Sequence, residues 1–410
     1  MTPTDLAQQF AILGAQPSFE TPLHVGCPNL GERDRLIERI NQIFERKWLT
    51  NHGPLVREFE GEIARRVGVK HCIAMCNGTV ALEISMRALG LRGEVIVPSF
   101  TFIATAHALQ WQKITPIFCD IDPQTHTIDP EQVERLITPR TTGIVGVHTW
   151  GRPCAADELD SIAARHKLKL MFDAAHAFGC TYKGRSIGSL GSLEVFSFHA
   201  TKFLNCGEGG AVVTNDDDLA QRVRLMSNFG FVDKDEVQYL GTNGKMSEMS
   251  AALGLTNLTH VDDFVQANRR NYDEYRKALE PIPGLDLLEY DDAEACNFQY
   301  VVVEVDDTKC PLSRDQIVDI LSAENVLARR YFWPGCHRME PYRSFFPDAD
   351  LLVPNTERVS SRVFLLPTGT AIQTTNIEKI CDLIRRAIHE GSRLSGLLSA
   401  QEIPLQTMSL

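Results

Sequence analysis

The sequence predicts an α/β protein built around a large, mostly parallel seven-stranded sheet, with a smaller C-terminal α/β domain after it. Three observations predict this fold. Short apolar runs rich in β-branched residues recur between about residues 70 and 215, helical stretches separate several of them, and polar or glycine-containing turns follow their ends. Strands that are apolar throughout are typical of a sheet covered by helices on both faces. Ligands bind such sheets at the carboxyl ends of the strands.

Seven apolar runs are expected to form the strands of this sheet. Helical patterns lie between several of them. Parallel neighbours need a long crossover connection, usually a helix, so this pattern indicates parallel strands. The expected strands are residues 71–75, 94–97, 116–121, 143–148, 169–172, 194–198 and 211–214, and the expected helices are residues 80–89, 130–137 and 155–166.

The segments on either side of the sheet set the expected domain boundaries. A helix is expected near residues 34–47, and a long helical region near 255–279 leads away from the sheet towards Pro281 and Gly284. Strand and helix patterns follow at 298–305, 313–324 and 376–390. We therefore expect an N-terminal segment and large domain at 1–255, a small domain at 256–395 and a polar tail at 396–410.

The overall composition argues against several classes of function. The chain has 410 residues and a formal net charge of −12, which disfavours a nucleic-acid or anionic-membrane surface. No stretch approaches the roughly 18 apolar residues of a spanning helix, and the first residues do not resemble a signal peptide. The eleven cysteines lack CxxC pairs, so we expect a reduced, cytoplasmic protein without a metal site or a disulfide framework.

Lys202 is the residue that points most directly to chemistry. It lies between the apolar run 194–198 and the glycine cluster 207–210, where backbone can approach a bound group closely. Most lysines are solvated surface charges. A lysine that is partly desolvated at a strand end is instead a nucleophile for an aldehyde, and its amine can later carry protons.

Asp173 closes the expected strand 169–172, and His176 follows it closely. The aspartate has two interpretations: a helix N-cap, or a buried carboxylate that keeps a pyridine nitrogen protonated. His176 is either a core histidine satisfied by backbone or a partner of the ring hydroxyl. A lysine that condenses with an aldehyde, together with such a carboxylate, is the pair that pyridoxal phosphate requires.

Residues 77–79 supply a candidate phosphate site at the start of the helix 80–89. Free N–H groups at Gly78 and Thr79, with the threonine hydroxyl, suit a phosphate, although a plain capping turn has the same pattern. Ser197 is a further candidate phosphate contact. Phe102 is a candidate to stack on the pyridine ring, or else a core residue.

Taken together, these motifs resemble the DegT/StrS-type sugar aminotransferases, which are pyridoxal-phosphate enzymes with the aspartate-aminotransferase fold (fold type I). The resemblance extends from about residue 49 to 370. The segments that carry it are residues 48–54, 59–60, 77–82, 173–179, 197–202, 207–210 and 243–248.

The resemblance implies a role for each candidate residue. Lys202 would form the covalent imine with the cofactor, Asp173 would pair with the ring nitrogen, and His176 would lie by the ring hydroxyl. The remaining cofactor contacts would come from Gly78, Thr79, Ser197 and Phe102.

The resemblance also implies a homodimer with the active site at the interface, in which Asn243 reaches the phosphate of the neighbouring subunit. Two positions depart from the family pattern. Lys245 replaces the usual arginine, and His199 lies in the segment before the lysine.

Residues 243–246 and 329–337 look most like enzymes that aminate C4 of a nucleotide-linked 4-keto-6-deoxyhexose, with L-glutamate as amino donor. The basic pair Arg329 and Arg330 would suit a diphosphate-sugar, although a solvated loop has the same composition. The candidate substrate contacts are Thr50, Arg330, Tyr331 and His337.

Three alternatives remain at this point: a C3-specific aminotransferase, a sugar 3-dehydratase and a non-catalytic regulatory homologue. The dehydratases of this family carry a histidine where Lys202 stands. The complete set of Lys202, Asp173 and His176 disfavours a regulatory protein. The sequence leaves open C3 or C4 amination, the axial or equatorial product, the nucleotide and the pathway.

Overall fold

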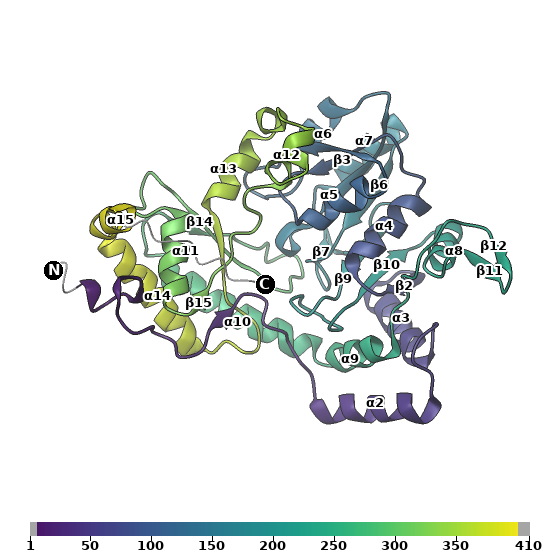
Figure 1. Cartoon of the computed structure of the whole chain (residues 1–410), viewed down its shortest axis with the longest axis horizontal. Helices are drawn as coiled ribbons and strands as arrows, with labels where there is room; N and C mark the ends of the chain where they lie inside the picture. The colour runs from purple at the N-terminus through teal and green to yellow at the C-terminus, as the bar shows by residue number, and fades with distance from the viewer. Residues whose placement is uncertain (1–5, 401–410) are drawn as a thin grey trace.

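The computed structural model describes residues 6–400, which fold into two lobes (Figure 1). The large lobe contains the central sheet. The small lobe contains α11 (Arg314–Ala323) and α14 (Thr374–His389). Helices α9 (Glu248–Leu258) and α10 (Val261–Leu279) run along one side of the molecule and connect the lobes.

The large lobe has the predicted seven-stranded sheet. Its spatial order is β2-β10-β9-β6-β5-β3-β4. Strand β10 is antiparallel to both of its neighbours, and the other neighbouring pairs are parallel. The strands are β2 (His71–Met75), β3 (Glu94–Pro98), β4 (Thr115–Cys119), β5 (Thr141–Val147), β6 (Lys169–Asp173), β9 (Leu193–Ser197) and β10 (Gly210–Thr214).

Successive side chains of the central strands enter two different cores, one on each face of the sheet. In β6, Leu170 and Phe172 join one core and Met171 joins the other. This alternation within a wholly apolar strand is what a sheet covered on both faces requires. The first face is covered by α3 (Pro54–Val67), α6 (Pro130–Leu136), α7 (Ala156–His166) and α9, and the second by α4 (Gly78–Ala88), α5 (Ile103–Gln110) and α8 (Asp217–Met226).

The small lobe is a three-stranded antiparallel sheet with helices packed on it. Its strands are β13 (Leu285–Leu287), β14 (Val301–Val305) and β16 (Val363–Leu366), in the order β13-β14-β16. Helix α14 packs against α10 and α11, and their apolar faces form a core separate from that of the large lobe. The predicted small α/β domain is therefore present.

The helical region predicted at 255–279 is two helices. Helix α9 ends at Leu258, and α10 begins at Val261 after His260, whose φ of −116° and ψ of 12° are not helical. The first helix packs on the large lobe and the second reaches the small lobe. The break lets the chain change lobes.

The predicted domain boundaries differ from the observed packing at both ends of the chain. Residues Leu6, Phe10 and Phe19 are buried in the core of the small lobe. Glu324 fixes this segment, because its two carboxylate oxygens accept the N–H groups of Ala11 and Ser18, each at 2.7 Å. The acceptor lies some three hundred residues away, so local sequence carried no sign of it.

The C-terminal part of the chain also crosses the expected boundaries. Cys336, Tyr342 and Val353 are buried in a core of the large lobe, and α12 (Tyr342–Phe345) lies on the side of this lobe in Figure 1. The predicted tail begins inside helix α15 (Gly391–Ala400), whose Leu394 is buried against the small lobe. Residues 401–410 lie outside the described residues.

The remaining elements are short connections and surface pieces. No helix between residues 6 and 400 has both the length and the apolar character needed to cross a bilayer. The remaining elements are η1 (Ala11–Leu13), β1 (Leu23–His24), α2 (Arg33–Arg46), η2 (Thr149–Gly151), β7 (Thr181–Tyr182), β8 (Arg185–Ser186), β11 (Phe231–Asp233), β12 (Glu236–Val237), β15 (Val326–Leu327), η3 (Cys336–Arg338), α12 (Tyr342–Phe345), η4 (Ala349–Leu352) and α13 (Pro354–Arg362).

Glu248 joins two of the motifs that are far apart in the sequence. Its carboxylate is buried and accepts the N–H groups of Leu55 and Val56, both at 2.9 Å, at the start of α3. A Cβ on Gly53 would lie 2.6 Å from Glu248 Cδ, so a side chain there would displace the Glu248 carboxylate. An anion at a helix N-terminus satisfies free N–H groups and opposes the helix dipole. These motif residues therefore support the fold.

Replacing Glu248 with alanine is expected to lower the free energy of unfolding by about 2–4 kcal/mol, because two buried N–H groups lose their acceptor. Urea unfolding followed by circular dichroism measures the change. The exposed Glu289 offers a matched control, and Glu289→Ala is expected to shift stability by less than about 0.5 kcal/mol. Equal stability of the two variants would contradict the capping role.

Candidate active site

The predicted site residues meet at the carboxyl ends of neighbouring strands. Lys202 lies in the loop between β9 and β10, and Asp173 is the last residue of β6. These strands are adjacent, with Asp173 opposite Val195. The loop is fixed from the small lobe, because the Gln299 side-chain amide donates to the Thr201 carbonyl at 3.2 Å.

The environment of Lys202 favours a neutral amine. Burial lowers the pKa of the Lys202 amine from its ordinary 10.5 to about 8, and the Asp173 carboxylate opposes the shift. Within residues 6–400 the amine forms no salt bridge. A fraction of the amine is therefore neutral and nucleophilic near neutral pH, as condensation with an aldehyde requires.

Asp173 is a buried carboxylate held by two donors. The Thr105 hydroxyl donates to Oδ2 at 2.9 Å and the Ala175 N–H donates to Oδ1 at 3.1 Å. Burial raises the pKa of Asp173, and these hydrogen bonds and the charge of Lys202 oppose the rise. Residues 174–180 form turns, so the helix N-cap interpretation is wrong. A buried carboxylate without a salt bridge among the described residues is complementary to a protonated ring nitrogen.

His176 is buried in an aromatic cluster beside this pair. Its Nδ1 accepts the Trp150 N–H at 3.3 Å, a backbone partner that is compatible with both interpretations of this histidine. The ring lies 4.5 Å from Tyr300 and 5.8 Å from Phe332, measured between centroids. Burial and the charge of Lys202 lower the pKa of His176 well below its ordinary value, so the imidazole is neutral.

The start of α4 has the form of a phosphate cradle. The Asn77 side chain caps the helix by accepting the Val80 N–H at 2.8 Å, and the N–H groups of Gly78 and Thr79 have no acceptor within the described part of the chain. A Cβ on Gly78 would lie 3.0 Å from Ser197 Cβ. The helix N-terminus and the Ser197 hydroxyl therefore face the same space, as an anion site requires.

Two other predicted cofactor contacts lie on the surface. Phe102 precedes α5 and is 55% exposed, so it is not a core residue. Asn243 is exposed in a loop whose neighbour Lys245 donates to the Asn228 side chain at 2.9 Å. Lys245 also lies 4.9 Å from the centroid of the Phe229 ring. The lysine that departs from the family pattern therefore braces this loop.

The four predicted substrate residues lie in different environments. Thr50 is exposed, and Tyr331 is half-buried with its ring stacked on Phe332 at 5.3 Å. Arg330 is directed to the small lobe, where it pairs with Asp315 at 2.9 Å. This ion pair engages one guanidinium nitrogen, and binding of a diphosphate by Arg330 stays a prediction.

The prediction that His337 contacts substrate is not supported by its position. The residue is 2% exposed, and both ring nitrogens are engaged, by the Ser99 hydroxyl at 2.6 Å and by Glu357 at 2.5 Å. These bonds tie the segment before α13 to the end of β3. The sequence showed only a histidine in a basic segment, because both partners are distant in the chain.

Sequence reasoning missed three residues that support the site: Thr105, Trp150 and Gln299. Thr105 and Trp150 each hydrogen-bond a predicted residue, and Gln299 hydrogen-bonds the neighbour of Lys202. None lies in a recognisable motif, so no sequence signal singled them out. Among the described residues, no group of three His, Cys, Asp or Glu side chains is placed to hold a metal.

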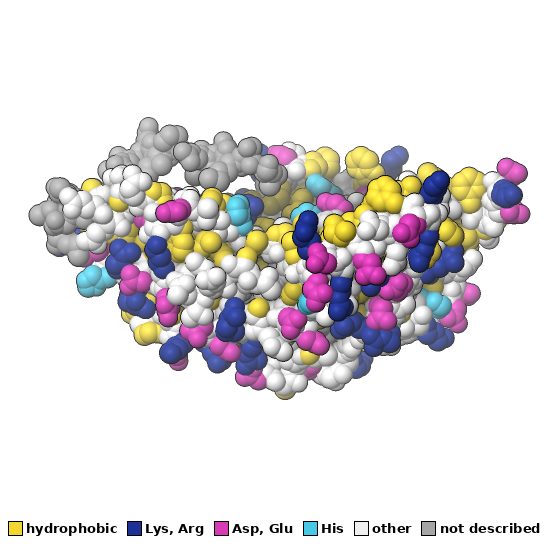
Figure 2. All heavy atoms as spheres, turned by 90° about the horizontal axis from the view of Figure 1, so that it is seen from below, with side chains coloured by type: hydrophobic (Ala, Val, Ile, Leu, Met, Phe, Trp, Pro, Cys, Tyr) yellow, Lys and Arg dark blue, Asp and Glu magenta, His cyan; other side chains and the backbone are white. Residues whose placement is uncertain are grey.

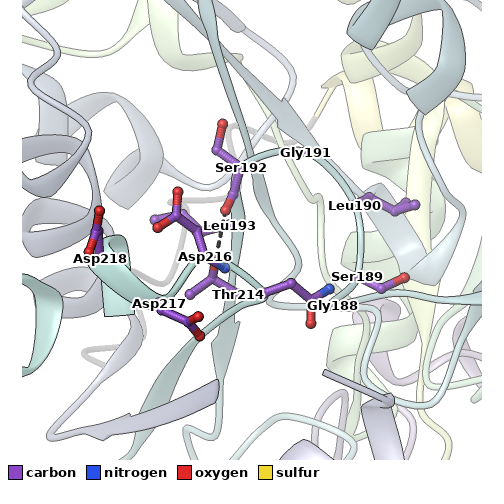
Figure 3. A pocket seen from close by; sticks show the side chains of 11 residues that line it. Gly188, Ser189, Leu190, Gly191, Ser192, Leu193, Thr214, Asp216, Asp217 and Asp218 are labelled. Atoms are coloured by element: carbon purple, nitrogen blue, oxygen red, sulfur yellow. Dashed lines mark hydrogen bonds between the residues drawn. The ribbon is translucent and has the colours of Figure 1, made fainter. Parts of the chain in front are cut away.

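A separate cavity of about 600 Å³ lies at the opposite ends of β9 and β10. Figure 3 shows Asp216, Asp217 and Asp218 on one side of it, and the Thr214 hydroxyl donating to the Ser192 carbonyl at 2.8 Å. Its acidic lining does not suit a phosphate. This cavity is not part of the Lys202 site.

Comparison with known proteins gives one consistent picture. The sequence profile described as the DegT/DnrJ/EryC1/StrS aminotransferase family matches residues 31–385. A dTDP-4-amino-4,6-dideoxy-D-glucose transaminase of Shigella dysenteriae is 38% identical over 368 residues, which is 90% of this chain and 99% of the relative. A GDP-perosamine synthase of Caulobacter vibrioides is 34% identical and covers 87% of this chain and 96% of the relative.

Solved structures agree with this assignment. A crystal structure of DesI in the presence of its TDP-sugar product has a TM-score of 0.92 and 49% identity, over 96% of this chain and 99% of the other. PseC of Helicobacter pylori, an aminotransferase, has a TM-score of 0.84 at 24% identity and covers 90% of this chain and 100% of the other. This second match shows the fold alone.

The lowered pKa of Lys202 predicts the pH dependence of its labelling. Attachment of pyridoxal phosphate to the apoprotein, trapped with borohydride and located by peptide mapping, is expected to increase with pH with a midpoint near 8, because the neutral amine reacts. Exposed lysines should titrate about two units higher. Asp173→Asn removes the charge that raises the pKa of Lys202, so its midpoint is expected below that of the wild type. A midpoint near 10.5 would contradict the burial argument.

Proposed function

Because the chain belongs to the DegT/DnrJ/EryC1/StrS aminotransferase family and is a pyridoxal-phosphate-dependent nucleotide-sugar aminotransferase, we propose its substrates. L-Glutamate donates the amino group, and C4 of dTDP-4-keto-6-deoxy-D-glucose receives it. The products are 2-oxoglutarate and dTDP-4-amino-4,6-dideoxyglucose. The observation that carries the reaction is a half-buried lysine amine beside a buried carboxylate at the sheet edge.

The relatives support the choice of sugar and nucleotide. The Shigella dysenteriae relative is named for a dTDP-linked 4-amino sugar, and DesI was crystallised with its TDP-sugar product. The Caulobacter vibrioides relative is named for a GDP-linked sugar. A GDP-linked 4-keto sugar is therefore the second candidate substrate.

The described residues fit the cofactor, and different residues would contact its phosphate, its ring and its ring nitrogen. The N–H groups of Gly78 and Thr79, with the Ser197 hydroxyl, would bind the phosphate, and Phe102 would lie against the ring. Asp173 would hold a proton on the ring nitrogen. When bound, pyridoxal phosphate supplies an aldehyde that carries the amino group and a ring that withdraws electrons.

Lys202 performs the proton transfers in this proposal. Its neutral amine would remove the proton from the α-carbon of glutamate, and in the second half-reaction its protonated amine would deliver a proton to C4 of the sugar. An amine whose pKa is about 8 suits both directions, because it takes up and releases a proton near neutral pH. Lys202 also argues against a sugar 3-dehydratase, because the dehydratases of this family carry a histidine at this position.

We infer a homodimer from the apolar surface around Asn243. The hairpin of β11 and β12 begins just after Asn228, which pairs with Asn243. The hairpin and its flank expose Val237 by 56% and Leu240 by 71%. Figure 2, seen from the side of α2, shows hydrophobic side chains gathered along the upper right edge. Apolar patches of this kind are typical of interfaces.

The dimer would bring Asn243 to the phosphate of the neighbouring subunit. The asparagine is exposed on its own subunit, so a neighbouring subunit has access to it. We also place the protein in the cytoplasm, because its eleven cysteines are free thiols.

The substrate proposal predicts a specific product. Incubation with L-glutamate and a panel of dTDP- and GDP-linked 3-keto and 4-keto sugars is expected to give a 4-amino sugar from the dTDP-linked 4-keto compound, identified by NMR. Lys202→Ala is expected to abolish turnover and to keep the circular dichroism spectrum of the wild type. Amination at C3, or near-normal turnover by the variant, would refute the proposal.

The dimer proposal predicts separate effects of two substitutions. Leu240→Asp is expected to shift the mass from dimer to monomer in light scattering, because it places a charge in an apolar interface. Asn243→Ala should leave the dimer intact and weaken binding of pyridoxal phosphate by about tenfold. Leu351→Asp, on an equally exposed leucine beside α13, is the control and should change neither. A monomeric wild-type protein would contradict the inference.

A further inference from the structure

Trp150 combines an unusual backbone with complete burial beside the active site. It lies in η2, just after β5, with φ of 65° and ψ of 10°, which is the left-handed region. A bulky residue rarely adopts this conformation, and where it does the strain must be offset by the surroundings. Here the conformation directs the Trp150 N–H to His176 Nδ1, at 3.3 Å.

This hydrogen bond decides which ring nitrogen of His176 carries the proton. A backbone N–H can only donate, so Nδ1 must accept with its lone pair. The ring is neutral, since burial and the charge of Lys202 both lower the pKa of His176. Its single proton is therefore on Nε2, and that nitrogen is a hydrogen-bond donor.

The indole of Trp150 is fixed from both lobes. Its Nε1–H donates to His126 Nδ1 at 3.2 Å, and the Nε2 of this buried histidine lies 3.7 Å from Glu304 of β14. The indole ring also stacks on Phe332, with centroids 5.1 Å apart and planes 8° apart. The residue therefore has little freedom to turn its N–H away from His176.

We propose that Trp150 is a positioning residue for transamination: its indole, anchored on His126, holds the backbone N–H on His176 Nδ1 and so presents Nε2–H to the ring hydroxyl of the cofactor. The tautomer of His176 follows from its hydrogen bond with the Trp150 N–H. The effect of this tautomer on the cofactor rests on the proposed function. A donor at the hydroxyl favours the ionised form of that oxygen, and this shifts the absorbance of the bound cofactor with pH.

Trp150→Phe is the decisive variant, because it keeps the aromatic stacking and removes the N–H that anchors the ring on His126. In the apoprotein labelled with ¹⁵N-histidine, the His176 signals are expected to change from a single Nε2–H tautomer to a mixture of both. In the holoenzyme the pH midpoint of the cofactor absorbance should increase by about half a unit or more. The kcat should decrease about tenfold with little change in KM.

Phe100→Leu is the matched control, because Phe100 packs edge-on against Trp150 at 5.9 Å and takes no part in the polar chain. It should lower the melting temperature and leave the tautomer and the midpoint unchanged. His126→Phe removes the same hydrogen bond from the other side, so it should give the same tautomer mixture and the same shift of the midpoint. It keeps the proposal testable if Trp150→Phe does not fold.

Either of two results would overturn the proposal: an unchanged His176 tautomer in Trp150→Phe and His126→Phe, or the same shift in Phe100→Leu. If the wild-type protein aminated none of the keto sugars, the proposed function would fail. The tautomer measured in the apoprotein would still stand.

Discussion

Partial removal of one amine and one carboxylate from water is the constraint on which the active site depends. Burial disfavours the charged forms of both Lys202 and Asp173, while each charge stabilises the other. The balance leaves a lysine that ionises near neutral pH and a carboxylate that can still hold a cationic ring. A more exposed lysine would remain protonated, and a more isolated carboxylate would not keep its charge.

Both lobes maintain this balance. The loop that carries Lys202 buries Phe203 and Leu204 in the core of the large lobe, and side chains from the small lobe hold its backbone. Buried amides hold it by its carbonyl groups: Gln299 donates to Thr201, and Asn29 donates to Phe203 at 3.3 Å. Asn297, also from the small lobe, donates to the His176 carbonyl at 2.9 Å. Directional bonds of this kind fix a loop more narrowly than apolar packing does. The small lobe thus positions the machinery of the large one.

The predicted cofactor residues and the predicted substrate residues differ in which parts of the fold position them. The lysine, the aspartate and the phosphate cradle belong to strand ends and a helix start, so the sheet itself positions them. The basic segment after Ala328 is engaged in the fold: Arg330 pairs with Asp315, and His337 lies between Ser99 and Glu357. Both side chains therefore already have partners within the chain, and a second subunit would add further groups at the exposed surface near Asn243.

The sequence by itself determined the seven strands and the small domain, and it singled out Lys202 and Asp173 as the predicted pair. These features are local, because apolar runs, helix starts and glycine clusters specify strands, helices and close approach over a few residues. Only the tertiary structure decided which lobe residues 6–24 join, that Glu248 caps α3, and that His337 is a buried brace. It also supplied Thr105, Trp150 and Gln299. Each of these depends on a hydrogen bond or an apolar contact between residues far apart in the chain, and such pairings are set by the three-dimensional path of the backbone.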